Sequence, residues 1–187
     1  CEKVGIKSKK IKLPANVPEK RLLQEIKALN EDKSVHGILV QLPLPQQINS
    51  SKVLELVAPE KDVDGFNPIN FGRLFAGEPL FTPATPTGIM ALLDAYGVKL
   101  EGKHVVVVGR SNIVGKPVAA LLLSRNATVT QCHSRTRNLQ EVTQQADVLV
   151  AAIGKPRFIT SEFIKQGAVV IDVGVNRLPD GTLTGDV

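Results

Sequence analysis

Four apolar, β-branched runs recur along the second half of the chain, separated by segments with helical spacing. The runs cover residues 104–109, 127–132, 147–152 and 168–173. Strands that read as nearly continuous apolar runs are typical of a sheet buried on both faces, and parallel strands need crossovers between them. The second half therefore predicts an α/β fold, a doubly wound parallel sheet with helices on both faces. The expected helices are residues 86–97, 113–124, 139–145 and 161–166.

The first half of the chain has a different pattern. Residues 17–30 have helical spacing, and Pro18 suits the first turn of a helix. Residues 49–57 also look helical, with Asn49 as a polar N-cap. Residues 37–42 are apolar except for one glutamine and end at a proline, which is typical of a short buried strand.

A long segment rich in Pro, Gly and Asn follows, over residues 59–87. We expect it to be irregular, with one short helix near residues 71–75, and long ordered loops often carry function. A domain boundary is expected near residues 83–87. The predicted domains are therefore residues 1–84 and residues 85–187, with the helix after the boundary as the bridge.

A glycine turn follows the first strand of the predicted sheet and opens a helix, over residues 109–117. Such a strand, turn and helix direct main-chain N–H groups and the positive end of the helix at a pyrophosphate. The turn departs from the usual pattern because Ser111 stands where a second glycine is expected. Its hydroxyl is then a candidate phosphate ligand. The turn predicts dinucleotide binding, and a plain strand-to-helix turn is the alternative.

The end of the next strand bears on the choice of cofactor. Enzymes that prefer NAD usually carry Asp or Glu there, to bind the ribose hydroxyls. This chain instead has His133, Ser134 and Arg135, and Arg110 lies in the glycine turn. Guanidinium groups bind a 2′-phosphate well, so these residues favour NADP. The alternative is that Arg135 is only a surface charge and that His133 is only a loop residue.

Charge and composition exclude several classes of function. The net charge is +5, and residues 1–30 alone hold eight Lys/Arg against three Glu. The chain has one tyrosine and no tryptophan, which argues against a nucleic-acid module with its stacking platforms. The basic excess is therefore either a solvated face or an attraction for an anionic small molecule. No apolar run is long enough to span a membrane.

The two cysteines, Cys1 and Cys132, favour a reducing compartment, because they cannot form a disulfide framework and have no metal-ligand company. We therefore expect no metal site. The chain opens on Cys1 rather than Met, so we expect it to be processed or part of a longer protein.

Three features of the first half are candidate sites. Gln41 lies in an otherwise apolar run, and a buried amide there is either structural or faces a ligand. Asp62 and Asp64 flank a valine in a charged segment that also suits a solvated turn. The stiff segment of residues 83–88 is well placed to line a cleft.

Taken together, these motifs resemble the methylenetetrahydrofolate dehydrogenase/cyclohydrolase (FolD) family. The resemblance runs in order along essentially the whole chain. It is carried by residues 37–45, 59–66, 85–88, 109–117, 133–134, 151–156, 171–176 and 185–187.

The resemblance implies a bifunctional enzyme of one-carbon metabolism. Its dehydrogenase passes hydride from 5,10-methylenetetrahydrofolate to NADP, and its cyclohydrolase hydrolyses the methenyl product to 10-formyltetrahydrofolate. It also implies a folate-binding domain before a Rossmann-like NADP-binding domain, a homodimer and a cytoplasmic location. The +5 charge would then serve two anionic ligands, NADP and a folate that carries glutamate carboxylates.

The same resemblance implies roles for individual residues. Gln41 would work beside a catalytic lysine, and Asp64 would anchor the pterin ring, since a carboxylate accepts two hydrogen bonds from an aminopyrimidine edge. Thr85, Val173 and Val175 would lie near the nicotinamide. The residues expected around the phosphates and ribose are Gly109, Arg110, Ser111, Ile113, Ser134 and Arg135.

This chain also departs from the family pattern. The catalytic lysine of the family lies in a Tyr-x-x-x-Lys segment, expected upstream of Cys1, and Tyr96 has the wrong spacing and place to replace it. The glycine-rich segment after Val187 and the final helix that returns to the first domain are missing too. We therefore expect the 187-residue chain alone to bind NADP weakly and to have little cyclohydrolase activity.

Two other classes stay open. One is a different NADP enzyme, such as a shikimate- or amino-acid-type dehydrogenase, against which Gln41 and the Asp62/Asp64 segment argue. The other is a non-catalytic dinucleotide-binding protein, supported only by the absent lysine.

Overall fold

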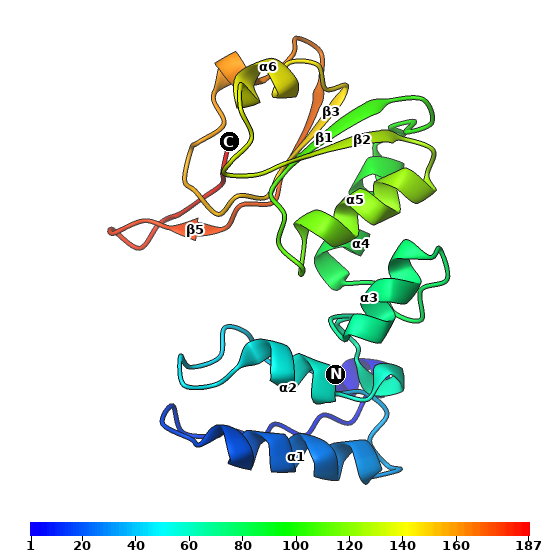
Figure 1. Cartoon of the computed structure of the whole chain (residues 1–187), viewed down its shortest axis with the longest axis vertical. Coiled ribbons are helices and arrows are strands. Elements are labelled where there is room, and N and C mark those ends of the chain that lie inside the picture. Colours follow the sequence, from blue (N-terminus) through cyan, green and yellow to red (C-terminus); the bar gives the residue numbers. More distant parts are fainter. The chain divides into compact units, whose positions relative to one another are not determined.

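The computed structural model describes the backbone of residues 1–187 and every side chain except that of Glu2. The chain forms two compact units, Cys1–Asp62 and Val63–Val187 (Figure 1). Residues 83–87, where the sequence predicts a domain boundary, lie inside the second unit.

The second unit is built on a parallel sheet of four strands. The strands are β1 (His104–Val108), β2 (Thr128–Cys132), β3 (Val148–Ala151) and β4 (Val169–Asp172). Their order is β2-β1-β3-β4, and every pairing is parallel. The predicted α/β fold with its parallel sheet is thus confirmed, because the four apolar runs form the four strands.

Helices cover both faces of this sheet (Figure 1). On one face lie α4 (Ala84–Ala95) and α5 (Gly115–Ser124), and on the other α6 (Leu139–Thr143) and the 3-10 turn η3 (Ser161–Phe163). Successive side chains of a strand point to opposite faces. Val105 and Val107 therefore join one core cluster, and Val106 and Val108 join the other.

Two further elements of the second unit lie outside the sheet. Helix α3 (Pro68–Phe75) begins where Asn67 Oδ1 accepts a hydrogen bond from Ile69 N at 2.8 Å, and it contacts α5. The strands β5 (Asn176–Arg177) and β6 (Leu183–Thr184) form a small antiparallel hairpin. No sequence pattern predicts this hairpin, because strands of two residues carry no periodic pattern.

The first unit consists of two helices and 3-10 turns around one core. The helices are α1 (Glu19–Glu31) and α2 (Ser50–Leu56), with the 3-10 turns η1 (Glu2–Val4) and η2 (Pro59–Lys61). Asn49 caps α2 as predicted, since its side chain accepts a hydrogen bond from Lys52 N at 3.1 Å. Pro18 is the residue just before the first turn of α1, rather than part of it.

The predicted buried strand over residues 37–42 is wrong. Only Ile38 makes a β-bridge, with Asp62, and its N–H donates to Lys61 O at 2.6 Å. Leu39 is 62% exposed. A strand needs a neighbour along its length, and within the described part of this unit a single bridge is all that this segment has.

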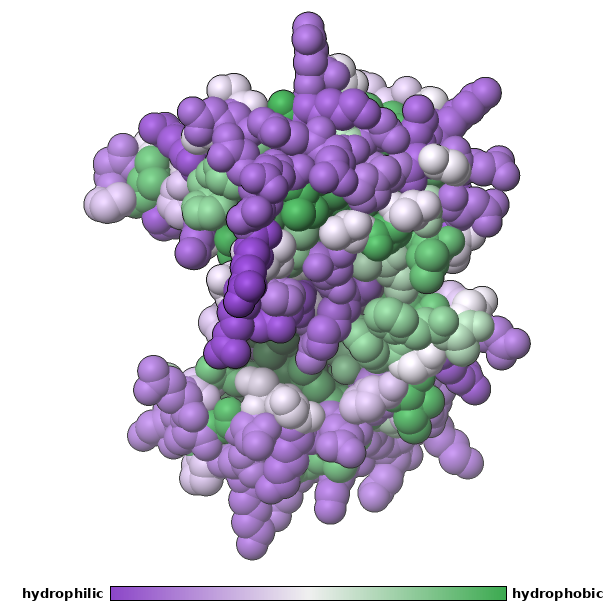
Figure 2. Space-filling model, turned by 45° about the horizontal axis from the view of Figure 1, so that its top comes forward, coloured by the Kyte–Doolittle hydropathy of each residue, from purple (hydrophilic) through white to green (hydrophobic). Residues whose placement is uncertain are grey.

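Polar side chains lie mainly at the surface. Hydrophilic residues cover much of the face seen in Figure 2, with apolar residues between them. The described polar or charged residues that are buried are Asp62, Asn67, Asn70, Thr143 and Asp186. A buried carboxylate must be hydrogen-bonded or paired to be tolerated, so each buried aspartate points to a local structural demand.

Candidate functional site: a pocket at the carboxyl ends of β1 and β3

The order of the sheet fixes where a ligand would bind. The chain passes from β1 outward to β2 and returns to β3 on the other side of β1, so β1 and β3 flank a topological switch point. Ligands of open α/β sheets bind outside the carboxyl ends of the strands at such a point. A pocket of about 280 Å³ lies there, lined by residues that follow β1, β2 and β3.

Four predicted cofactor residues line this pocket together, namely Gly109, Arg110, Ser111 and Ser134. Lys155 and Phe158 also line it, and no sequence pattern predicts a role for them there. The Lys155 ammonium lies over the Phe158 ring, 5.4 Å from its centroid. Neither residue belongs to a recognisable phosphate motif, so only the fold brings them to the pocket.

Glycine is required at two positions of the turn after β1. Gly109 has a φ of +134°, and an added Cβ would meet the carbonyl group of Ala152, which follows β3. At Gly115, an added Cβ would meet the carbonyl group of Gly109. The turn is therefore packed tightly against the end of β3 and the start of α5, as a dinucleotide-binding turn requires. On this observation the residues present fit a dinucleotide.

Ser111 has a different role from the one expected for the second glycine. Its Oγ accepts hydrogen bonds from Val114 N at 3.1 Å and Gly115 N at 3.2 Å, and its carbonyl accepts one from Lys116 N at 3.0 Å. The next helical residue, Pro117, has no N–H. The expected main-chain N–H donors at the start of α5 are thus already bonded. At this helix start, an anion would therefore be met by the helix dipole, by side-chain cations and by hydroxyl donors, in addition to any N–H group of the turn before Val114.

We expect Ser111→Ala to lower the free energy of unfolding by about 1 kcal/mol, because it removes the cap of α5. Ser124→Ala is the control, since the Ser124 hydroxyl only donates to Leu121 O at the other end of the same helix. Urea denaturation of both variants measures the difference. Equal losses in the two variants would contradict the capping role.

A tight turn after β2 brings further polar groups to the pocket. His133 N donates to Thr136 Oγ1 at 2.9 Å, and Arg135 N donates to His133 Nδ1 at 3.1 Å. Because Nδ1 accepts, the neutral ring carries its proton on Nε2. Ser134 lines the pocket, and the next residue, Arg135, is exposed. Of the described residues that line the pocket, none is acidic.

The Cys132 thiol is buried directly below this turn. Burial raises its pKa, and a hydrogen bond with Thr136 opposes that rise only in part. The thiol is therefore held in its neutral form at physiological pH, which suits a packing role in the core cluster of β1 and β3.

The loop after β3 forms another wall, and its main chain is held by a buried carboxylate. The Asp186 carboxylate accepts hydrogen bonds from Ile153 N at 2.7 Å, Gly154 N at 3.0 Å and Lys155 N at 2.9 Å. Burial acts to raise the pKa of Asp186, but the side chain of Asn176 and these N–H groups together hold it below its ordinary value. The sequence showed Asp186 only as part of a motif.

The remaining predicted cofactor residues do not line this pocket. Thr85 is exposed in the first turn of α4, and Ile113 is 40% exposed in the glycine turn. Beyond β4, Val173 is half-buried and Val175 is 78% exposed. Arg135, which follows Ser134 in the sequence, is exposed.

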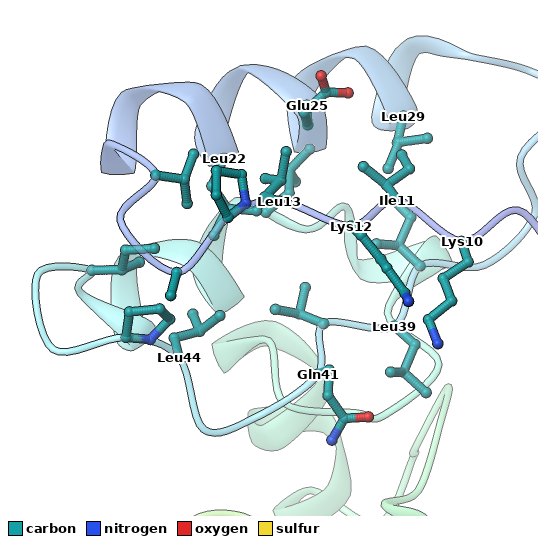
Figure 3. Close-up of a pocket in the computed structure, with 18 residues that line it drawn as sticks. Lys10, Ile11, Lys12, Leu13, Leu22, Glu25, Leu29, Leu39, Gln41 and Leu44 are labelled. Carbon is teal, nitrogen blue, oxygen red and sulfur yellow. The ribbon is translucent and has the colours of Figure 1, made fainter.

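The first unit contains an apolar pocket of about 410 Å³ of its own, to which Gln41 belongs (Figure 3). Lys10 and Lys12 are among the residues that line it. Gln41 is exposed, and its Nε2 donates to Leu42 O at 3.0 Å. The premise that this amide is buried is therefore wrong, because the predicted strand around it does not form.

The charged segment that follows α2 lies partly in the first unit and partly in the second. Lys61 Nζ donates to Leu29 O, Asn30 O and Asp32 O at 3.0, 2.7 and 2.9 Å, and so caps the carboxyl end of α1. This half of the segment is structural. Asp64 belongs to the second unit, where it is half-buried next to Gly65, whose φ is +67°.

The described residues provide neither a metal-binding cluster nor a membrane-spanning helix. None of their His, Cys, Asp and Glu side chains group in threes that could hold a metal ion. Of the helices described, none combines the length and apolar character needed to cross a membrane.

Two models of known protein families match this chain, one in each half. The profile of the tetrahydrofolate dehydrogenase/cyclohydrolase catalytic domain matches residues 1–64, and that of the tetrahydrofolate dehydrogenase/cyclohydrolase NAD(P)-binding domain matches residues 83–187. The bifunctional protein FolD of Anoxybacillus flavithermus is 57% identical over all 187 residues. The chain spans 66% of that relative's length.

Solved structures give the same result. Bifunctional FolD from Campylobacter jejuni is 49% identical with a TM-score of 0.96, over 100% of this chain and 67% of that one. The N5,N10-methylenetetrahydrofolate dehydrogenase-cyclohydrolase of Trypanosoma brucei is 43% identical with a TM-score of 0.87, over 94% of this chain and 62% of that one. The latter structure was solved with NADP and an inhibitor.

Proposed function

This chain belongs to the tetrahydrofolate dehydrogenase/cyclohydrolase family, and from that premise we propose what the whole protein does. It oxidises 5,10-methylenetetrahydrofolate to the 5,10-methenyl form with NADP, and hydrolyses that product to 10-formyltetrahydrofolate. Bound NADP supplies the hydride acceptor, and the protein supplies binding and orientation. The 187 residues contribute the cofactor pocket and a part of the folate domain.

The observation that carries the proposal is the pocket at the carboxyl ends of β1 and β3. In this pocket, Gly109 lets the turn after β1 pack closely against the end of β3. The pocket is also lined by a cationic side chain, that of Arg110, and by the hydroxyl group of Ser134. The N–H groups at the start of α5 are occupied by Ser111. Side-chain cations therefore carry most of the attraction for phosphate, and this favours NADP, with its additional 2′-phosphate, over NAD.

Individual roles follow from the family resemblance. Ser111 and Ser134 donate hydroxyl hydrogen bonds to the phosphates and ribose, where Arg110, Arg135 and Ile113 also contribute. On the nicotinamide side, the proposed residues are Thr85, Val173 and Val175.

On the folate side, we assign Asp64 to the pterin ring, because a carboxylate accepts two hydrogen bonds from an aminopyrimidine edge. Gln41 is assigned to the reacting carbon, beside the family's lysine. Its exposed position supports the ligand-facing role. Lys10 and Lys12 add positive charge near Gln41, which suits a folate with glutamate carboxylates.

We propose a cytoplasmic homodimer, as the family resemblance implies, that binds no nucleic acid. The two cysteines support a reducing compartment, because both are free, with Cys1 exposed and Cys132 buried.

Titration of the 187-residue chain with NADPH and NADH, followed by nicotinamide fluorescence, tests the cofactor part of the proposal. We expect NADPH to bind at least about tenfold more tightly, which corresponds to one charge-assisted contact with the 2′-phosphate. Equal affinities would overturn the choice of NADP. Turnover of the whole protein with 5,10-methylenetetrahydrofolate, followed by NADPH formation, tests the activity. Reduction of NADP by a hydroxy acid instead would overturn it.

A further inference from the structure

Two carboxylates that do not line the pocket hold together the segments that follow β3 and β4. We propose that Asp186 is a positioning residue, which shapes the cofactor pocket by holding the main chain of residues 153–155. The nature of the ligand rests on the proposed function, whereas the positioning does not.

The contacts of Asp186 are numerous for one side chain. Oδ2 accepts from Ile153 N and Gly154 N, and Oδ1 accepts from Lys155 N. Oδ1 also accepts from Asn176 Nδ2 at 2.9 Å. The carboxylate is fully buried, so water cannot replace any of these bonds. Each bond to a charged acceptor is stronger than a neutral one, and the N–H groups left by its loss would be unsatisfied.

A second carboxylate holds Asp186 itself in place. Asp172, the last residue of β4, accepts hydrogen bonds at Oδ1 from Gly174 N and Asp186 N, both at 2.9 Å. Its Oδ2 also accepts from Val187 N at 3.3 Å. The chain from β4 to Asp186 is thereby folded back, so that the carboxylate from the end of the chain reaches the loop that follows β3.

Two glycines make room for this arrangement. An added Cβ at Gly174 would meet the Asp186 side chain, and one at Gly185 would meet the Asp172 carboxylate. The main chain adds two bonds, from Arg157 N to Gly185 O at 3.1 Å and from Ile159 N to Asp186 O at 2.8 Å. The close packing of Gly174 and Gly185 against the two carboxylates holds the Asp186 side chain in the orientation that binds the loop.

The loop so held is a wall of the pocket. Ile153 and Lys155 both line it, and between them Gly154 has a φ of +69° with open space around its Cβ position. The Ile153 side chain packs against the core cluster of β1 and β3, whereas Gly154 has no packing partner at its Cβ position and Lys155 is exposed. The hydrogen bonds to Asp186 therefore hold the main chain of the loop where side-chain packing is sparse. Since Asp186 lies behind the loop and lines no part of the pocket, it acts through the loop.

The test uses Asp186→Asn in the 187-residue chain, with Asp180→Asn as a matched control. Asp180 also accepts two hydrogen bonds at one oxygen, from Thr182 N and Thr182 Oγ1, but it lies in the exposed β5–β6 turn. Amide hydrogen exchange by NMR and the dissociation constants of NADPH and NADH are measured for both variants and for the unchanged chain.

In Asp186→Asn, we expect the amides of residues 153–155 to exchange at least about tenfold faster, while those of β1 and β3 stay protected. The dissociation constants of NADPH and NADH should rise together by about tenfold, since the wall is shared by both ligands. Asp180→Asn should leave all these quantities unchanged. A merely structural role would accelerate exchange throughout the sheet and leave the affinity of the folded fraction unchanged.

Unchanged exchange at residues 153–155, or unchanged affinities beside faster exchange, would overturn the positioning role. If Asp186→Asn does not fold, hydrogen exchange in the unchanged chain tests the positioning role instead. The role then requires the amides of residues 153–155 to exchange more slowly than the exposed amide of Thr182. If the unchanged chain binds neither nucleotide, the proposed function fails, and the exchange data still decide whether Asp186 holds the loop.

Discussion

Gly109→Ala is expected to lower the free energy of unfolding by about 3 kcal/mol or more, and to abolish measurable NADPH binding. Two costs combine at this position. A φ of +134° is strained for any residue with a Cβ, and the added methyl group would meet the carbonyl of Ala152. Because Ala152 N is itself bonded to Val108 O, the end of β3 cannot withdraw without breaking the sheet.

Gly181→Ala separates these two costs. Gly181 has a φ of +86°, and nothing lies within 4 Å of its Cβ position, so only the conformational cost remains. We expect a loss of about 1 kcal/mol there, with NADPH binding unchanged. Urea denaturation and nucleotide titration measure both variants. Equal losses in the free energy of unfolding of the two variants would show that the close approach of the turn to β3 adds no cost to Gly109→Ala.

Arg110→Ala and Arg135→Ala are each expected to raise the dissociation constant of NADPH by about tenfold or more, and that of NADH by less than about twofold. A guanidinium group matches the geometry of a phosphate dianion, and the described lining of the pocket contains no acid to bind ribose hydroxyls instead. Since Ser111 occupies the N–H groups at the start of α5, no main-chain donor there can compensate.

Arg177→Ala is the control for the loss of one positive charge. Arg177 lies in β5, where its guanidinium donates to Gly181 O at 3.0 Å, and it does not line the pocket. Its replacement should leave the ratio of the two affinities unchanged. Equal effects of Arg110→Ala on NADPH and NADH would refute the assignment of a 2′-phosphate site to this corner. A rise of both constants together is instead the signature expected for Asp186→Asn.

The contrast between residues 104–108 and residues 37–42 shows where sequence patterns suffice. Both segments are apolar and β-branched in part, and both predict a buried strand. The first finds parallel partners on both sides, at β2 and β3, while the second makes one bridge at Ile38. Strand formation depends on neighbours from elsewhere in the chain, and a local pattern does not contain them.

The residues of the candidate site also fall into two groups, those that local motifs predict and those that only the family resemblance predicts. Gly109, Arg110, Ser111 and Ser134 lie in local motifs and line one pocket, and their binding of a cofactor stays a prediction. Thr85, Val173 and Val175 stay predictions, which come from the family resemblance.

By itself the sequence determined the parallel sheet, the glycine turn and the absence of an acid after β2, because each is written in residues that are neighbours along the chain. The tertiary structure alone decided that Lys155 and Phe158 line the pocket, and that Asp186 holds the loop after β3. Thirty-three positions separate Asp186 from Ile153. A buried carboxylate finds its hydrogen-bond donors wherever the folded chain brings them, and only packing determines where that is.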